Sequence, residues 1–253
     1  MGAGHGTHLH VEGHSVVHRL PAHTKLVGLV VFVLLVVALP RDAHGLRVAT
    51  LLVAVGVVAA TRVPLRHVAS RLVVEVPFVV FALVLPFVAT GPQRTIGPVT
   101  VSRDGLDAGL ALLATATTSV LMAISFATTT SSRDLVRALQ HLRVPDRLVQ
   151  ILSFMVRYLG VVGSQAQRMK VARESRGFRA RSLGSWPVIA SSAGALFIRS
   201  YERGERVHLA MMSRGYTGQM PVTDPLSAGR RDWSRALLPS AFAVVALVIG
   251  YAA

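Results

Sequence analysis

The chain has 253 residues, of which 52% are apolar and only 15% are charged, and its mean hydropathy is +0.53. These values exclude an ordinary soluble globular fold and make a membrane protein the first class to test. The sequence contains no cysteine, which excludes disulfides, thiolate metal sites and cysteine nucleophiles. The net charge of +15 suits either a nucleic acid or an anionic membrane surface as a partner, so its distribution along the chain decides between them.

Histidines are concentrated at the N-terminus, where the first 23 residues hold six of the ten in the chain. A pair such as His8 and His10 can chelate a divalent transition ion, because neutral imidazoles bind zinc, cobalt, nickel and copper. A His-rich segment without a fixed scaffold is more typical of a loose, solvated tail. We therefore expect residues 1–25 to form a His-rich N-terminal tail and expect no cofactor, with a metal site at His5, His8 and His10 as the weaker alternative.

Five apolar stretches stand out in the sequence, at residues 26–39, 46–60, 72–90, 106–127 and 236–253. The third and fourth meet the requirement of roughly 20 residues for a helix that crosses the hydrocarbon core. The first two are shorter, and we interpret them as spans that extend into flanking residues or as a tightly turned membrane hairpin; buried helices of a soluble core are the alternative. A cleaved signal peptide is disfavoured, because a second apolar stretch follows closely on the first. The sequence thus predicts an all-α membrane protein, with a four-helix transmembrane region at residues 26–127 and a fifth transmembrane helix at residues 236–253.

Polar residues and prolines within the spans have structural interpretations. Glu75 lies near the start of the third stretch, and Arg71, four residues earlier on the same helical face, is its expected ion-pair partner. Pro77 and Pro86 are expected to bend this helix. The hydroxyl groups of the fourth stretch are expected to bond to carbonyls of their own helix or to permit close helix packing.

Positive charge is concentrated between the fourth and fifth stretches. Residues 165–235 contain thirteen lysines and arginines against five acidic residues, and the positive-inside rule places this segment in the cytoplasm. Counting back along the spans, residues 61–71 and the N-terminus are also cytoplasmic. The loops at 40–45 and 91–105 and the C-terminus are then outside. Aromatic residues are too scattered in the basic segment for a nucleic-acid surface, so we expect membrane lipid, and no nucleic acid, as a partner.

Residues 128–235 are predicted to form a cytoplasmic helical coupling domain. Ser131 and Asp134 resemble the capping box at the start of a short amphipathic helix. A second helix is expected at about 148–177, apolar at first and basic towards its end. A third helix is expected at about 198–214.

The second and third of these helices end in the same unit of sequence. The two copies are Ser175-Arg176-Gly177-Phe178 and Ser213-Arg214-Gly215-Tyr216. A left-handed glycine after an arginine in the last turn is an ordinary helix C-terminus, and this is one interpretation of the repeat. It does not explain why the serine and the aromatic residue recur. A planar guanidinium at the tip of a rigid helix also suits insertion into a groove on a partner, where carbonyls and carboxylates accept its hydrogen bonds.

Motifs throughout the chain resemble one transporter family. The segments DLVRAL, RVPDRL, VRYLG, VARESRGFR and ERVHLAMMSRGY follow one another between Ser131 and Tyr216, and HRLPAHTKL precedes the first span. In this order they resemble the T component of energy-coupling factor (ECF) transporters, above all the cobalt/nickel-type branch with the cobalt transport protein Q subunit. No stretch matches the phosphate-binding loop G-x-x-x-x-G-K-[ST], so any ATP-driven work must come from another subunit.

The resemblance implies a multi-pass, non-enzymatic protein of the cell membrane with a cytoplasmic coupling domain. Its two coupling helices would dock into two ATP-binding-cassette (ABC) ATPase subunits, identical or different, and it would hold a separate substrate-binding S component. The docking motifs would be Ser175, Arg176 and Gly177, and Ser213, Arg214 and Gly215, with serine where the family has alanine. The resemblance implies no substrate-binding residue in this chain.

The function implied is that of a coupling subunit in ATP-driven uptake of cobalt or nickel. A shared T component that serves vitamin-binding S components is the alternative within the family. A stand-alone metal carrier or sensor that uses the His-rich tail is the alternative from another class.

Overall fold

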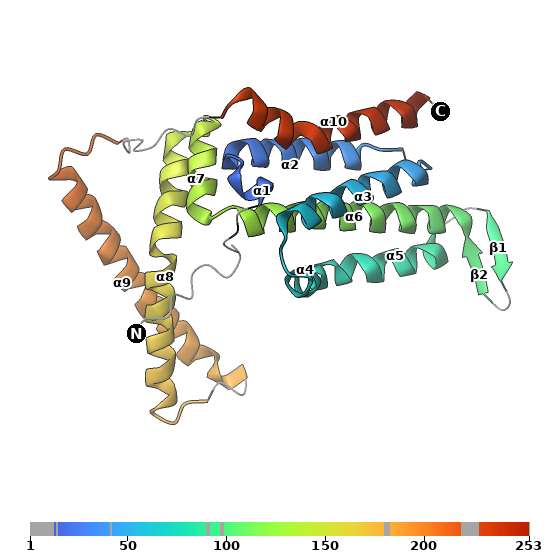
Figure 1. The fold of residues 1–253 in the computed structure, drawn as a ribbon. Coiled ribbons are helices and arrows are strands. Elements are labelled where there is room, and N and C mark those ends of the chain that lie inside the picture. The colour runs from blue at the N-terminus through green and yellow to red at the C-terminus, as the bar shows by residue number, and fades with distance from the viewer. Residues whose placement is uncertain are drawn as a thin grey trace. The chain divides into compact units, whose positions relative to one another are not determined.

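A computed structural model describes residues 13, 15–40, 42–89, 92–96, 99–179, 183–218 and 228–252 of the chain. Its α-helices, in chain order, are α1 (Val16–Arg19), α2 (Ala22–Val37), α3 (His44–Thr61), α4 (Leu65–Leu72), α5 (Val76–Val88), α6 (Arg103–Thr129), α7 (Ser132–His141), α8 (Asp146–Glu174), α9 (Trp186–Met212) and α10 (Arg230–Ala252) (Figure 1). Short 3-10 turns lie at Val73–Glu75 (η1) and Leu183–Ser185 (η2), and the strands β1 (Gln93–Ile96) and β2 (Val99–Ser102) form an antiparallel hairpin. Helices carry the fold, which confirms the predicted all-α class. The hairpin is a small addition that the sequence analysis did not predict.

The chain divides into two compact units. The bundle unit comprises Leu9–Ala138 and Leu226–Ala253 and contains α1 to α6, most of α7, and α10. The arm unit comprises Met1–His8 and Leu139–Pro225 and contains α8 and α9.

Among the described residues, five helical segments are long and apolar enough to cross a membrane: His44–Thr61, Arg66–Val88, Arg103–Thr129, Asp146–Glu174 and Arg230–Ala252. This is the predicted number, and four of the segments contain or closely match predicted apolar stretches. The first predicted stretch forms α2, whose 16 residues fall short of the roughly 20 that a span needs. Helix α8 joins the set instead, although it is the least apolar of the five.

The third predicted span is interrupted between α4 and α5. The chain forms the 3-10 turn η1 at Val73–Glu75, and Pro77 lies in the first turn of α5. Because proline lacks an N–H and its ring clashes with the carbonyl four residues earlier, the α-helical hydrogen-bond pattern breaks just before it. The expected disturbance is therefore present at Pro77, whereas Pro86 lies inside α5.

Glu75 has a different partner from the one expected. It is buried and accepts a hydrogen bond from the hydroxyl of Thr117 on α6. The expected pair with Arg71 is not among the ion pairs within the described part of the chain. A 3-10 turn rotates by about 120° per residue instead of about 100°, so η1 changes the face on which Glu75 lies.

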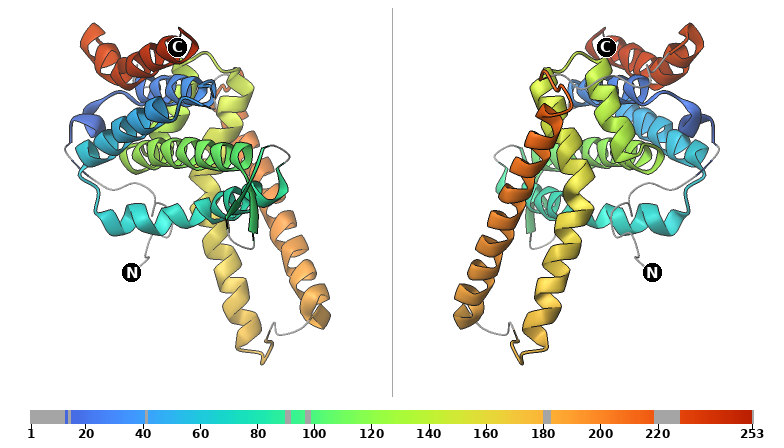
Figure 2. Two further views of the ribbon diagram at one scale, coloured as in Figure 1. Left: turned by 90° about the vertical axis from the view of Figure 1, so that its right-hand side faces the viewer. Right: turned by 90° about the vertical axis from the view of Figure 1, so that its left-hand side faces the viewer.

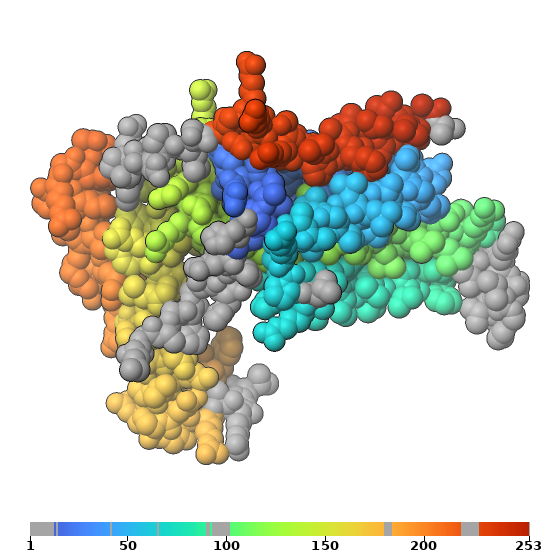
Figure 3. Space-filling view, in the orientation of Figure 1, coloured from blue at the N-terminus to red at the C-terminus, as the bar shows by residue number. Residues whose placement is uncertain are grey.

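The bundle unit is organised around α6, which packs against α3, α5 and α2, while α10 packs mainly against α2. Figure 3 shows the surface of α10, in red, lying against the blue surfaces of α2 and α3. Phe32, Val36, Ala54, Leu121 and Ala243 lie in its buried core. Burial of these side chains away from lipid and water fixes the positions of the spans relative to one another.

Three glycines, Gly28, Gly105 and Gly109, lie at the closest helix contacts in the bundle unit. A Cβ atom at Gly28 of α2 would lie 2.5 Å from the carbonyl oxygen of Ala236 on α10, and one at Gly109 of α6 would lie 2.7 Å from that of Ala82 on α5. Small residues at such contacts are typical of helix pairs in membranes, because they let the backbones approach closely. Because α10 lies so close to α2, the hydroxyl of Ser240 can donate to the carbonyl of Gly28 at 3.0 Å.

One end of the bundle unit collects the start of α2, the start of α10 and the end of α6. Lys25 Nζ donates to the carbonyl of Thr129 at 2.8 Å, and the rings of His23 and Trp233 are 5.8 Å apart. At the other end, the Tyr251 hydroxyl donates to the carbonyl of Ala38 at 3.2 Å. Helices α2 and α10 therefore run parallel to each other and antiparallel to α6.

The loop between α2 and α3 and the start of α6 lie together at that other end. His44 Nε2 is 3.3 Å from Asp107 Oδ1. Arg47 of α3 is buried, and its guanidinium donates to the carbonyl of Leu39 at 2.8 Å and to the hydroxyl of Thr115 on α6. A buried guanidinium is costly unless it is hydrogen-bonded, and here it satisfies a carbonyl that follows the end of α2. Arg47 thus fastens the α2–α3 loop to α6.

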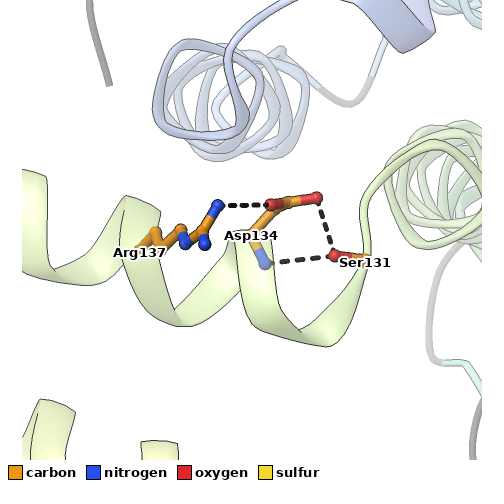
Figure 4. Close-up of polar contacts among 3 residues, drawn as sticks. All are labelled: Ser131, Asp134 and Arg137. Carbon is orange, nitrogen blue, oxygen red and sulfur yellow. Dashed lines mark hydrogen bonds and ion pairs between the residues drawn. The ribbon is translucent and has the colours of Figure 1, made fainter. Parts of the chain in front are cut away.

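The Ser131 side chain caps the start of α7, as the sequence predicts. The Ser131 hydroxyl accepts a hydrogen bond from the backbone N–H of Asp134 at 3.2 Å and lies 2.6 Å from the Asp134 carboxylate (Figure 4). Arg137, one turn further along, is 3.8 Å from the same carboxylate. The bond to Ser131 satisfies a backbone N–H group that would otherwise lack a partner at the start of the helix. The short amphipathic helix expected from the sequence is confirmed.

Candidate functional site

Helix α8 ends in a Schellman motif formed by the first Ser-Arg-Gly unit, residues 175–177, which we call the α8 tip. Gly177 has φ +80°, and its N–H donates to the carbonyl of Glu174 at 3.0 Å. The N–H of Phe178 reaches back to the carbonyl of Arg173 at 3.1 Å. The Ser175 hydroxyl donates to the carbonyl of Ala172 at 3.1 Å. The tip therefore satisfies carbonyls that a helix end otherwise leaves to water.

Helix α9 ends in the same motif at residues 213–215, the α9 tip. Gly215 has φ +79° and donates to the carbonyl of Met212 at 3.0 Å, and the N–H of Tyr216 donates to that of Met211 at 3.0 Å. The Ser213 hydroxyl donates to the carbonyl of Ala210 at 3.0 Å. The two tips thus repeat each other hydrogen bond by hydrogen bond, and their helix-end geometry is confirmed.

This geometry explains why the serine, the glycine and the residue after it recur, but it does not explain why the arginine recurs. The glycine supplies the positive φ, and the serine and the residue after the glycine supply the capping bonds. Arg176 and Arg214 are exposed, and in the described part of the chain their side chains make no ion pair or hydrogen bond. Each guanidinium therefore presents all five of its N–H donors at the end of a long helix.

The two tips lie at opposite ends of an antiparallel helix pair. One hollow between the helices is lined by residues 165–172 of α8 and 199–203 of α9, and a second by residues 150–162 of α8 and 200–216 of α9. Figure 2 shows the two helices, in yellow and orange, beside each other with opposite chain directions. Tyr216 lies opposite Phe154, so Gly177 is more than six helical turns further along, and the tips are roughly 35 Å apart.

The helix pair is held by few buried side chains. Val149 is the buried residue of α8, and no residue of α9 is buried. Phe154 and Tyr158 stack with their ring centroids 6.2 Å apart on the face of α8 that lines the second hollow. Apolar side chains such as Leu159, Phe197 and Leu209 remain exposed. An arm unit with so much exposed apolar surface has the character of a part that is covered in an assembly or by lipid.

Helix α9 is longer than the sequence analysis predicted. It begins at Trp186, well before the expected start near Ile198. Pro187 in its first turn is the signal that identifies this start, because proline is well tolerated there and its φ suits a helix. The expectation was wrong because Gly194 and the serines beside it weaken the helical pattern of this segment.

The alternative metal site at His5, His8 and His10 lies outside the described residues. Within the described residues, no group of three or more histidine, aspartate and glutamate side chains is placed to hold a metal ion.

Comparison with known proteins adds to this geometry. The family profile CbiQ, described as cobalt transport protein, matches residues 13–223. This chain belongs to that family. The matched segment includes both tips and leaves out residues 1–12 and α10.

Individual relatives carry both names used in this family. The energy-coupling factor transporter transmembrane protein EcfT of Bacillus selenitireducens is 27% identical over 223 residues, which cover 83% of this chain and 82% of that protein. The cobalt transport protein CbiQ of Rhodobacter capsulatus is 28% identical over 221 residues, which cover 84% of this chain and 87% of that protein. An uncharacterized protein of Methanocaldococcus jannaschii is 32% identical over 122 residues, about half of each chain, at 48% of this one and 46% of that one. With its apolar helices, the chain is a multi-pass membrane component of a transport family.

Proposed function

We propose that this chain is the coupling subunit of an ATP-driven importer of the ECF type. In this proposal Arg176 and Arg214 each insert into a groove on one of two ABC-type ATPase subunits. Closure of the ATPases on ATP moves the tips, and the arm unit passes this movement to a substrate-binding subunit in the membrane. The observation that carries the proposal is the pair of matching tips with free arginines, in a chain of the CbiQ family.

The chemistry of the tips supports docking into a protein groove. An arginine side chain offers a planar fork of donors that suits carbonyl and carboxylate acceptors, and it is desolvated at lower cost than a lysine ammonium. The Schellman motif ends each helix abruptly, so the guanidinium projects from a fixed backbone. Two equal tips suit two similar ATPase grooves, and a separation of roughly 35 Å lets each tip reach a different subunit.

The family description and the charge pattern support the rest of the proposal. The substrate we propose is cobalt or nickel, because the matching family is described as cobalt transport protein. We propose that the arm unit faces the cytoplasm, and the excess of lysine and arginine in residues 165–235 supports this orientation. ATP hydrolysis then belongs to the partner subunits, since the sequence has no phosphate-binding loop.

The decisive experiment replaces each tip arginine by alanine in the assembled transporter. Truncating one partner of a buried, hydrogen-bonded charge pair costs roughly 2 to 5 kcal/mol, so each single variant should bind the ATPases more weakly and transport more slowly. The Arg176→Ala, Arg214→Ala double variant should lose transport or release the ATPases on purification. Arg176→Lys should restore only part of the function, because lysine lacks the planar fork.

Matched controls are Arg157→Ala and Arg179→Ala, which remove exposed charges of the arm unit outside both tips. These variants should bind the ATPases and transport at close to the normal rate. A double tip variant that still copurifies with its ATPases and takes up cobalt or nickel normally would show that the tips are only well-capped helix ends.

A further inference from the structure

Three arginines that belong to neither tip converge on one hollow between α8 and α9. This basic hollow has a volume of about 440 Å³ and is lined by Gln165, Arg168, Met169, Ala172, Arg199 and Arg203. No carboxylate lines it, and within the described residues the three guanidinium groups make no ion pair or hydrogen bond. Like charges that face one hollow repel each other unless an anion lies among them.

Two acidic residues close in sequence to this hollow are paired with other basic residues. Glu174 is 3.9 Å from Lys170, and Glu202 is 3.9 Å from Arg206, each pair along its own helix. Neither carboxylate lines the hollow. The described lining of the hollow therefore carries positive charge and no carboxylate.

A second, apolar hollow continues from the basic one along the same helix pair. It has a volume of about 480 Å³ and shares Arg203 with its neighbour. Its lining includes Ile151, Phe154, Val162, Val207 and Met211. Polar side chains such as Gln150, Ser200 and His208 also line it, but most of its accessible surface is apolar, so this hollow suits hydrocarbon better than a strongly hydrated group.

The two adjoining hollows match a ligand with an anionic head and an apolar chain. We propose that they bind one anionic phospholipid, with its phosphate among Arg168, Arg199 and Arg203 and an acyl chain in the apolar hollow. Arginine is well suited to phosphate, because its planar fork can donate two hydrogen bonds at once.

The sequence of α8 favours a lipid over an acidic peptide as the occupant. The helix is apolar enough to meet the criteria for a membrane span, and its basic half includes Arg168, Lys170 and Arg173. A change from apolar to basic side chains along a helix is typical of the boundary between hydrocarbon and headgroups. The basic hollow lies at this change, and the apolar hollow lies on its apolar side.

Lipid binding by the purified full-length chain in detergent tests the proposal. Native mass spectrometry would follow a titration with short-chain phosphatidylglycerol, and separately with phosphatidylcholine of the same chain length. We expect one phosphatidylglycerol to bind at least roughly tenfold more tightly than phosphatidylcholine, because each basic residue near a phosphate favours the anionic lipid. Inorganic phosphate should not displace it, because phosphate ion leaves the apolar hollow unfilled.

Two triple variants with the same change in charge separate a built site from a general attraction. Arg168→Gln, Arg199→Gln and Arg203→Gln together should weaken phosphatidylglycerol binding at least roughly tenfold. Arg147→Gln, Arg157→Gln and Arg179→Gln together should weaken it less than about twofold, since screening limits the effect of exposed charges outside the hollow. Circular dichroism would establish that both variants keep their helix content. If the first one does not, the single Arg203→Gln variant carries the test, with a loss of about threefold or more.

Four outcomes would overturn the proposal. Equal losses in the two triple variants would mean a general attraction to the basic arm unit. Displacement by inorganic phosphate would mean a site for the free anion. No preference for phosphatidylglycerol would exclude an anionic lipid. Unchanged lipid binding, with loss of a copurifying partner in the first triple variant, would mean that the hollow receives an acidic protein segment.

Discussion

At the residue scale, the backbone conformation requires glycine at positions 177 and 215, and a lack of space for a side chain does not. Their φ values of +80° and +79° lie in the region that disfavours side chains, yet a Cβ atom at either position would meet nothing within 4 Å. A residue other than glycine therefore costs roughly 1 to 2 kcal/mol at the tip through its backbone conformation alone. The side chains of the tip arginines, by contrast, take no part in the capping bonds, to which Arg176 and Arg214 contribute only backbone N–H groups, so the two residue types should be separable by mutation.

We predict that Gly177→Ala frays the end of α8. The substitution should speed amide hydrogen exchange at Phe178, whose N–H donates to the carbonyl of Arg173, and should also reduce transport. The control is Gly163→Ala, in the interior of α8 with open space around it, which should stabilise the helix by roughly 0.5 to 1 kcal/mol. Unchanged exchange at Phe178 in the Gly177→Ala protein would mean that the left-handed glycine does not hold the tip.

Glu75 and Arg47 show at the same scale why buried polar groups of the bundle unit resist prediction from sequence. Each has its main partner on another helix, Thr117 for Glu75 and Thr115 for Arg47. Helical spacing relates residues within one helix, so it pointed to Arg71 as the partner of Glu75 and gave no partner for Arg47. The contacts depend on how α3, η1 and α6 pack against one another, and the spacing of residues along the sequence carries no information about this packing.

At the element scale, the closest helix contact in the bundle unit offers a sharp test of packing. We predict that Gly28→Ala lowers the stability of the detergent-solubilised protein by roughly 1 to 3 kcal/mol, because its Cβ would lie 2.5 Å from the Ala236 carbonyl oxygen. Thermal unfolding would measure the loss. Gly56→Ala in α3 is the matched control, since nothing lies within 4 Å of a Cβ there. Equal stability of the two variants would mean that α2 and α10 are not in such close contact.

The sequence predicted helices well wherever the apolar or capping pattern was continuous. Long apolar runs gave α3, α6 and α10, and Ser131 with Asp134 gave the start of α7. The hairpin β1–β2 was missed, because its strands are four residues long and pair only with each other. The twin tips were found as a repeat in sequence. The arginines of the basic hollow were not, because α8 and α9 had to be paired before Arg168 could face Arg199 and Arg203.

At the scale of the whole molecule, the packing of the bundle unit and the charge pattern make one prediction about the membrane. Helices α2 and α10 run parallel, and α6 runs antiparallel to them, so the loop near residue 42 and the start of α6 belong on one side. We predict that Gly97→Cys reacts with an impermeant thiol reagent added outside intact cells, and that Gln140→Cys and Ala190→Cys react only after the membrane is opened. The absence of native cysteine makes the labelling specific. Reaction of Ala190→Cys from outside would reverse the orientation and remove the arm unit from the ATPases.

The antiparallel pairing of α8 and α9 also makes the arm unit a pair of rigid levers, here called legs, whose tips lie at opposite ends of the pair. Each leg is a continuous helix of 29 or 27 residues, with a length fixed at about 1.5 Å per residue, so neither leg can stretch. The joint is soft by comparison, because so few side chains are buried between the legs. A change in the placement of the two tips must then come from the angle between the legs. A rotation of about 10° moves a tip that lies about 20 Å from the pivot by roughly 3 to 4 Å. Because the tips lie at opposite ends, this movement is mainly sideways and changes the direction of each tip more than the distance between them. A molecule bound between the legs would set their resting angle and so the direction in which each tip meets its partner.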